Sequence, residues 1–230
     1  MLNSYVNLLT LNGTNVPPLN IKKQYNSYMT ELREYIECFF PLTNAEWCEF
    51  SALFKPVFYK KGTIIYDFPE ERKGLCFIVE GLLRSYKLTD TGRDYTWAFY
   101  CLNSEAIENR MLLNACMIEH LSFQQKQPSE LTFEVLVDSR LICINKQDLE
   151  KLYESSVRWQ KFARIVAENA YCSTQHRTIS LLTKNAQERL EEIEEYFPAL
   201  FEKSVLLDHI ASYIGITRQS LNRLRRGESK

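Results

Sequence analysis

The spacing of apolar residues changes twice along this chain, which predicts a helical part, a stranded part and a second helical part. In the first part, apolar residues recur every three or four positions, as they do on the buried face of a helix. One helix is predicted in YMTELREYIECFF, beginning near Tyr28. A second is predicted in TNAEWCEFSALF, where Thr43 can cap the helix and Glu46 follows at the position of a capping box. The Asn-rich residues 1–28, which include NVPPLN, are expected to form an irregular extension.

From Val57 the period changes to two, which is the period of a β-strand. Strands are expected in VFYKKGTIIYDF, GLCFIVEGLLRSYKL, DYTWAFYC and LTFEVLVDSRLICIN, which are rich in β-branched and aromatic residues. Glycines at positions 62, 74, 81 and 92 lie at the turns. Short strands spaced by roughly ten residues are typical of an antiparallel sandwich or jelly roll. The segment between 104 and 127 breaks the pattern and is expected to be helical or irregular.

The second helical part begins near Gln147 and contains one unusually long helix. SSVRWQKFARIVAENAYCSTQHRTISLLTKNA runs without glycine or proline. A seam of apolar and small residues along it favours pairing with a second copy, with polar Asn169 setting the register. The alternative is a helix that packs only on its own domain. The seam consists of Trp159, Phe162, Val166, Ala170 and Ser173, beside Ile165, Asn169, Cys172 and His176. A further helix, NAQERLEEIEEYF, presents an acidic face and ends at Pro198.

The last segment, HIASYIGITRQSLNRLRR at 209–226, carries the most specific pattern in the chain. Ala211 is small enough for two helices to cross there, and Gly215 can take the left-handed conformation of a tight turn. Thr217 follows the turn and is placed to cap the next helix. The apolar residues of the segment are spaced to face one side: Ile210, Ile214, Ile216, Leu221 and Leu224. This arrangement predicts a helix-turn-helix.

Because those apolar residues face inward, the polar residues of the second helix must face outward, and their types suit DNA. Arginine can pair with guanine, and Gln or Asn with adenine, through two hydrogen bonds each. Four residues are expected to read base edges: Arg218, Gln219, Asn222 and Arg223. Three flanking residues are expected to contact phosphates: Thr217, Arg225 and Arg226. The alternative is an amphipathic terminal helix with a solvated basic face.

A jelly roll, a long helix and a C-terminal helix-turn-helix, in that order, resemble the Crp–Fnr family of bacterial transcription regulators. The resemblance covers about residues 29–226 and rests on FIVEGLLRSYKL, ENAYCSTQHRTISLL and HIASYIGITRQSLNRLRR. In that family the second helix presents Arg, an acidic or amide residue and a later Arg to DNA. Arg218, Gln219 and Arg223 match those places. The resemblance implies a homodimer, paired through the long helix, on a pseudo-palindromic operator.

The sensor part departs from the family members that bind cyclic AMP. Those members carry a Gly-Glu pair, which holds a ribose hydroxyl, and an Arg before Ser or Thr, which neutralises the cyclic phosphate. Here the corresponding segments read YCLNSEAIENRML and QKQPSELTFEVLV, so Gly-Glu is missing. Ser129 and Glu130 stand where Arg and Ser/Thr are expected, and a carboxylate there would repel a phosphate. The nucleotide pocket is therefore predicted to be degenerate, and regulation is not expected to depend on cyclic AMP.

Two further features of the family are also reduced in this sequence. Cys38 and Cys48 alone do not make the N-terminal cluster of the iron–sulfur branch, and none of the three histidines is singled out as a haem ligand. We therefore expect no cofactor and no metal site. Only GESK follows Arg226, so the winged hairpin is expected to be missing or reduced, with Lys230 joining the phosphate contacts.

Composition and charge restrict the class of protein but not its partner. The chain has 230 residues and a net charge of −1, which does not argue against nucleic acid because basic residues can gather on one face. It contains neither an apolar run of about 18 residues nor a secretory signal, so we expect a cytoplasmic protein without membrane contact. The seven cysteines are scattered, without metal-ligand spacing, and are expected to be buried and reduced.

These observations predict an α+β protein with an antiparallel β jelly-roll sensor domain, a long dimerisation helix and a small helix-turn-helix domain. The expected division is an irregular extension at 1–28, a cyclic-nucleotide-binding-like domain with flanking helices at 29–148, the dimerisation helix at 149–184 and the DNA-binding domain at 185–230. The expected function is that of a dimeric, sequence-specific transcription regulator and not an enzyme. The expected partners are double-stranded DNA, a second copy and an unidentified small effector, with RNA polymerase as a further candidate.

Two alternatives from other classes remain open. An effector-sensing protein would bind an unidentified small molecule in the barrel and use its helical tail for protein contacts. Aromatic barrel residues would then line the pocket, although most of them are expected to be core. These residues are Tyr66, Phe68, Phe77, Tyr86, Trp97, Phe99, Phe123 and Phe133. A cupin-like enzyme needs clustered His and Glu ligands on its strands, and only His120 lies in the barrel region.

Overall fold

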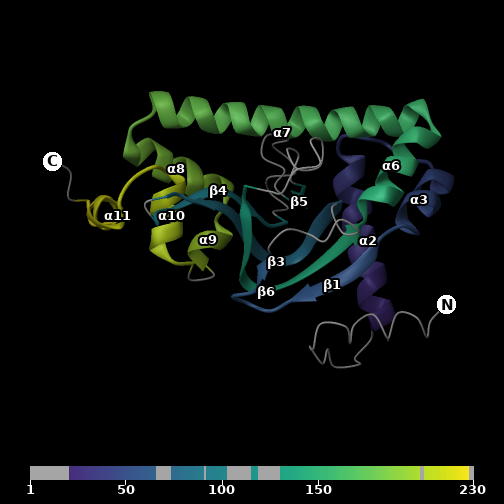
Figure 1. The fold of residues 1–230 in the computed structure, drawn as a ribbon, viewed down its shortest axis with the longest axis horizontal. Helices are drawn as coiled ribbons and strands as arrows, with labels where there is room; N and C mark the ends of the chain where they lie inside the picture. The colour runs from purple at the N-terminus through teal and green to yellow at the C-terminus, as the bar shows by residue number, and fades with distance from the viewer. Residues whose placement is uncertain are drawn as a thin grey trace.

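A computed structural model describes residues 21–65, 74–90, 92–102, 115–118, 130–202 and 205–227. The long helix α7 (Val157–Thr183) runs along one side of a β-sheet (Figure 1). One end of the molecule holds α2 (Ile21–Glu37), α3 (Asn44–Ser51) and α6 (Lys146–Ser155). The other end holds α8 (Ala186–Tyr196), α9 (Ala199–Glu202), α10 (Leu207–Tyr213) and α11 (Arg218–Arg225). The predicted α+β class is confirmed.

The sheet is antiparallel and is built around two long strands. Its members are β1 (Lys55–Tyr59), β2 (Ile64–Ile65), β3 (Leu75–Leu88), β4 (Asp94–Tyr100), β5 (Cys116–Met117) and β6 (Thr132–Ile144). The strand order is β1-β6-β3-β4, with β2 paired to β6 and β5 paired to β3. All four stretches that alternate in sequence contain strands, and β5 is an additional short strand within a segment expected to have none. The strand β4 therefore lies at an edge of the sheet.

A glycine allows β3 to bend against β6. Gly81 has a φ of +118°, and a Cβ atom there would lie 2.1 Å from Ser139 Oγ. The same Ser139 Oγ accepts a hydrogen bond from Leu82 N at 3.2 Å. The pairing of β3 with β6 shifts register on both sides of Gly81, as at a β-bulge, and such bulges bend a strand.

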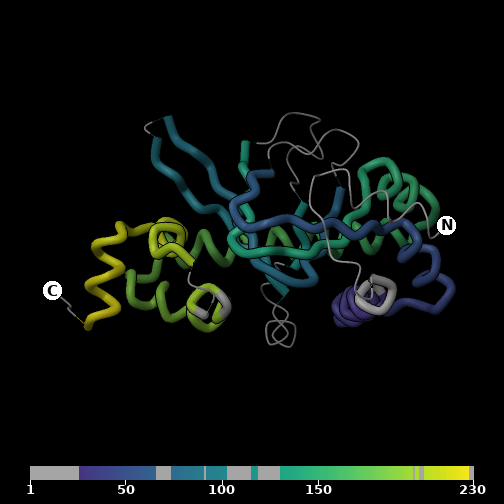
Figure 2. Tube along the Cα trace, turned by 90° about the horizontal axis from the view of Figure 1, so that it is seen from below, coloured from purple at the N-terminus to yellow at the C-terminus, as the bar shows by residue number. Residues whose placement is uncertain are grey.

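The buried apolar side chains form three clusters. One joins α2, α3 and the start of α7 to one end of the sheet and includes Phe50 and Phe162. A second lies within the sheet and includes Val135. The third, which we call the shared core, combines sheet residues with residues of the C-terminal helices. Its members are Leu82, Phe99, Cys101, Leu136, Leu190, Ile193, Phe197, Leu200, Ile210, Ala211, Ile214 and Leu221. The C-terminal helices therefore pack directly on the sheet, and Figure 2 shows this arrangement from below.

The helix boundaries differ from the predictions in two places. Helix α2 begins at Ile21, so the expected irregular extension at 1–28 is wrong for residues 21–28, while residues 1–20 lie outside the described residues. No glycine or proline follows Pro18 before this helix ends, which lets it start earlier than the apolar pattern indicates. The predicted boundary at 149 falls inside α6, because Ser156 is extended and caps α7 through Trp159 N.

The seam predicted for dimerisation faces the protein's own core. Trp159 and Phe162 are buried, and the Trp159 ring stacks on Phe50 with centroids 5.3 Å apart. Further along the seam, Val166, Asn169, Ala170 and Ser173 line a cavity under α7. The predicted seam is therefore wrong for Trp159, Phe162 and Asn169, which face the protein's own interior, whereas its Cys172 is exposed. The sequence pattern identifies a helix face but not the neighbour that covers it.

The cysteines also depart from the expectation of buried thiols. Cys76 and Cys143 lie opposite each other on β3 and β6, with Cα atoms 4.1 Å apart, and form a disulfide. Cys48 and Cys172 are exposed. Apolar neighbours in sequence indicate burial, but they do not show which residue lies opposite on the next strand.

Candidate nucleic-acid interface

The last two helices form the predicted helix-turn-helix, at the end of the molecule remote from α2 (Figure 1). Gly215 lies in the turn with a φ of +74°, a conformation that side chains with a Cβ atom rarely adopt. A Cβ atom there would also lie 3.3 Å from Leu181 Cδ2 at the end of α7. The turn is closed by a hydrogen bond of 2.9 Å from Ile216 N to Ala211 O. The turn therefore holds α11 at a defined angle to α10.

The apolar residues of the motif face the shared core, as the sequence predicts. Leu221 is completely buried, and Ile210, Ala211 and Ile214 are 2 % exposed or less. Ile216 and Leu224 are half-buried and pack against the same cluster. These contacts orient α11 so that its opposite face points into solvent.

The residues expected to contact DNA all lie on α11, its cap or its end. Arg218, Gln219 and Arg223 are exposed, and Asn222 is half-buried beside them. Thr217 caps the helix, because its Oγ1 accepts a hydrogen bond of 3.2 Å from Ser220 N. Two more exposed side chains follow at the C-terminal end, Arg225 and Arg226, whereas Lys230 lies outside the described residues. The segment 217–226 thus carries four arginines and no acid.

Sequence reasoning missed one acidic neighbour of this face. Asp208 lies in the first turn of α10, and its Oδ2 accepts a hydrogen bond of 2.8 Å from Arg218 Nη1. Both side chains are about half exposed, at 52 % and 57 %. The two residues are far apart in the local helical pattern, so the pairing depends on the angle between α10 and α11.

Helix α10 is hydrogen-bonded to the edge strand β4. Ser212 Oγ donates to Asp94 O at 2.9 Å and accepts from Thr96 N at 2.8 Å. Arg177 of α7 donates to Thr96 O at 3.0 Å and to Tyr213 O at 3.1 Å. Its guanidinium also lies 4.4 Å from the centre of the Tyr213 ring. The helix-turn-helix, the edge strand and α7 are thereby connected by direct polar contacts.

A buried arginine organises the same strand from within the sheet. Arg84 is 3 % exposed and binds both carboxylate oxygens of Asp94, at 2.7 and 2.5 Å. It also donates to Glu134 Oε2 at 2.8 Å and to Thr96 Oγ1 at 3.1 Å. A planar guanidinium can satisfy all these acceptors at once, which a lysine could not do.

The neighbouring histidine of α10 is buried against this network. Burial lowers the pKa of His209 below 6.5, and the Arg84 charge lowers it further, although the carboxylates of Glu134, Asp94 and Asp208 oppose the shift. The folded protein therefore favours the neutral imidazole. Below the pKa of the unfolded state, the unfolded chain binds this proton more readily than the folded one.

We therefore expect the free energy of unfolding to fall as the pH decreases through 6.5 towards the lower folded-state pKa of His209. Urea unfolding at about pH 7.5 and about pH 5.5 measures the change, and His209→Gln should lose less stability than the wild type between these values. Equal losses in both proteins would show that His209 does not contribute.

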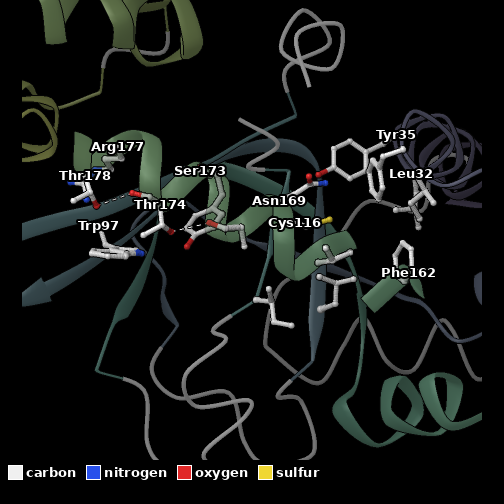
Figure 3. A pocket seen from close by; sticks show the side chains of 18 of the residues that line it. Leu32, Tyr35, Trp97, Cys116, Phe162, Asn169, Ser173, Thr174, Arg177 and Thr178 are labelled. Atoms are coloured by element: carbon white, nitrogen blue, oxygen red, sulfur yellow. Dashed lines mark hydrogen bonds between the residues drawn. The ribbon is translucent and has the colours of Figure 1, made fainter. Parts of the chain in front are cut away.

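A cavity of about 140 Å³ lies between α7 and the sheet (Figure 3). Its walls are mostly apolar at the end nearest α2, where Leu32, Tyr35 and Phe162 lie. At the other end, Arg177 Nε is buried and has no hydrogen-bond partner within the described ranges. The cavity extends to Tyr213 of α10, so its walls include the sheet, α7 and the helix-turn-helix.

The aromatic residues proposed as a pocket lining are mostly elsewhere. Trp97 lines the cavity, whereas Phe77, Phe99 and Phe133 are buried core and Tyr86 is half-buried. The remaining three, Tyr66, Phe68 and Phe123, lie outside the described residues. The expectation that most of these aromatic side chains belong to the core is confirmed for Phe77, Phe99 and Phe133.

Ser129 and Glu130 replace the Arg and Ser/Thr that are expected to hold a cyclic phosphate, and only the second of them lies within the described ranges. Ser129 lies outside the described residues, whereas Glu130 is exposed just before β6. A hydrogen bond from Lys87 of β3, together with the charge of Lys87, lowers the pKa of the Glu130 carboxyl. This carboxylate therefore stays negatively charged near neutral pH.

The described ranges contain neither a candidate membrane span nor a candidate metal site. No helix there is both long and apolar enough to cross a membrane. No three His, Cys, Asp or Glu side chains there are grouped so that they could hold a metal ion.

Comparison with known proteins gives the same architecture. Residues 56–156 match the family model of the cyclic nucleotide-binding domain. No curated protein matches the chain in sequence. The FixK2 structure from Bradyrhizobium japonicum is 22 % identical with a TM-score of 0.57, covering 76 % of this chain and 83 % of that one. A Crp/Fnr-family transcriptional regulator from Eubacterium rectale is 18 % identical with a TM-score of 0.59, covering 81 % and 83 %.

A third similar structure is a cyclic nucleotide-binding domain containing protein from Listeria monocytogenes, 14 % identical with a TM-score of 0.56, covering 87 % and 89 %. At these identities the comparison supports the fold. The predicted resemblance is confirmed at that level: residues 56–156 match the cyclic nucleotide-binding domain, and the chain has the fold of the Crp/Fnr-family structure from Eubacterium rectale.

Proposed function

We propose that this chain, which has the fold of the Crp/Fnr regulators, is a dimeric, sequence-specific DNA-binding transcription regulator without catalytic activity. It reads a pseudo-palindromic operator through the helix at 217–226. Base reading is assigned to Arg218, Gln219, Asn222 and Arg223. Phosphate contact is assigned to Thr217, Arg225 and Arg226.

The observation that carries this proposal is the division of α11 into two faces. Leu221 is completely buried in the shared core, while Arg218 and Arg223 on either side of it are exposed. A helix with a buried apolar side and an outward side of Arg, Gln and Asn suits the major groove, where these side chains pair with base edges. The positive charges of the exposed arginines favour the phosphate backbone as well.

The charge of Glu130 supports regulation without cyclic AMP. A cyclic phosphate would have to approach a carboxylate whose ionised form is stabilised by Lys87. The cavity under α7 is the feature that favours the effector-sensing alternative, because a small molecule there would contact α7 and Tyr213 together. Such a ligand would need an acceptor group for Arg177 Nε.

The dimer is proposed to form along the outer side of α7, away from the sheet (Figure 1). Cys172 and Ile179 are exposed there and lie seven residues apart, which is the spacing of a coiled-coil seam, whereas Ile165 of the same series packs against the protein's own core. Tyr171, Ile179 and Leu182 are 66 %, 52 % and 80 % exposed, an unusual amount of large apolar surface for one helix. A second copy packed on this face would cover it and would place two helix-turn-helix units on a two-fold symmetric site.

This seam makes Cys172 a direct probe of the dimer. In a parallel helix pair, equivalent seam residues face each other, close enough for a disulfide. We expect mild oxidation to cross-link two protomers, and Cys172→Ser to abolish the cross-linked band on a non-reducing gel. Cys48→Ser is the matched control, because Cys48 is also exposed but lies on α3. Cross-linking that persists in Cys172→Ser and disappears in Cys48→Ser would contradict the proposed seam.

The proposed function is tested by selecting binding sites from random duplex DNA with the purified protein. Enrichment of a two-fold symmetric site supports it.

A further inference from the structure

The outward face of α11 is basic, yet an acid is paired with its first arginine. Asp208 Oδ2 accepts a hydrogen bond of 2.8 Å from Arg218 Nη1. A carboxylate next to a DNA-binding helix repels the phosphate backbone, so by charge alone Asp208 would weaken binding. The ion pair has a second effect, however, because it restricts the orientation of the Arg218 guanidinium.

The contact with Asp208 occupies one edge of the Arg218 guanidinium and leaves the other edge to face DNA. The contact with Asp208 uses only Nη1, and the described residues provide no hydrogen-bond partner for Nε or Nη2 of Arg218. Nε and Nη2 form the side edge of the guanidinium, with two parallel N–H groups. That edge matches O6 and N7 of guanine, which accept two hydrogen bonds in the major groove.

A free arginine side chain has many rotamers, and binding a base in one of them costs conformational entropy. A carboxylate on the opposite edge restricts those rotamers before DNA arrives. Helix α10 has no side-chain cap at Leu206, and Asp208 lies in its first turn, where a negative charge also interacts favourably with the helix N-terminus. Asp208 can both restrict the rotamers of Arg218 and stabilise the N-terminus of α10. Only the restriction of Arg218 affects sequence preference.

We propose that Asp208 is a specificity-determining residue that orients Arg218 for paired hydrogen bonding to a guanine. This inference rests on the proposed function and adds a residue to it. Asp208 itself does not contact the base, so it acts as a positioning residue through Arg218.

The test compares Asp208→Ala and Asp208→Asn with the wild type on two duplexes. One is the site selected by the wild type, and the other carries a substitution at the base pair for which Arg218→Ala loses its preference. Asp208→Ala should reduce the ratio of the two affinities by roughly five-fold, the upper range for an exposed ion pair. Asp208→Asn, which keeps an acceptor but loses the charge, should retain part of the preference.

Two controls separate orientation from charge and from folding. Glu195→Gln removes the same charge from an exposed position of α8 and should leave the ratio unchanged. In the Arg218→Ala background, Asp208→Ala should have no further effect on the ratio. Thermal unfolding of each variant shows whether α10 has been destabilised, and a stability loss without a change in the ratio would overturn the inference.

The remaining outcomes are also decisive. If Asp208→Ala increases the affinity for both duplexes by the same factor, Asp208 acts only as a repelling charge and the inference is wrong. If the wild type itself selects no site, the proposed function fails and the inference fails with it. These two failures are distinguishable, because only the second occurs in the wild type.

Discussion

Replacing Arg218 and Arg223 together with alanine is expected to abolish selective DNA binding while leaving the fold intact. Each base-reading arginine should contribute about 1–3 kcal/mol of discrimination, so the double variant should lose roughly two orders of magnitude or more in preference for its selected site. Both side chains are exposed, and surface substitutions of this kind change stability little. Fluorescence anisotropy with the selected duplex and a scrambled duplex measures the preference directly.

The matched control is Arg225→Ala with Arg226→Ala, which removes the same charge from the end of α11. If these two residues contact phosphates, the variant should bind all sequences more weakly, with the salt dependence reduced by about one unit per lost contact. The selected duplex should still be preferred. Equal effects of both double variants on both duplexes would mean that α11 binds DNA only through its charge.

Leu221→Ala is expected to destabilise the whole protein by about 2–5 kcal/mol, the usual range for a completely buried leucine. Leu221 is 0 % exposed and belongs to the shared core, which also contains Leu82 and Phe99 of the sheet. Because helix and sheet residues occupy one cluster, we expect a single cooperative transition. Urea unfolding followed by far-UV circular dichroism and by tryptophan fluorescence should give the same shifted midpoint.

Leu88→Ala serves as the control for that experiment, since Leu88 is 60 % exposed near the end of β3. Its effect should lie within about 0.5 kcal/mol of zero. Two separate transitions, with only the helical signal shifted by Leu221→Ala, would contradict a shared core. The C-terminal helices would then fold as an independent unit.

The features that follow from sequence are those that depend on neighbours along the chain. The spacing of Ala211, Gly215 and Leu221 defines a helix-turn-helix because the turn and both helix faces lie within one short segment. The capping box of α3 is another example, with Thr43 Oγ1 accepting from Glu46 N and Glu46 Oε2 accepting from Thr43 N. The strands follow from alternation for the same reason.

The features that do not follow from sequence are those set by tertiary neighbours. The apolar side of α7 was identified, but Trp159 and Phe162 pack on Phe50 from a distant helix rather than on a second copy. Cys76 and Cys143 pair because β3 and β6 place them in register. In the candidate site, the identity of the outward residues was predictable, whereas the contact of Asp208 with Arg218 depends on the crossing of two helices.

Sequence-specific DNA binding is tested by selection of sites from random duplex DNA with the wild-type protein at physiological salt, without added ligand. We expect enrichment of a two-fold symmetric site whose half-sites are about one helical turn, or a multiple of it, apart. Arg218→Ala/Arg223→Ala should enrich no such site under the same conditions. Weak, salt-sensitive binding by the wild type without sequence preference would show that the protein is not a sequence-specific regulator in the absence of a ligand.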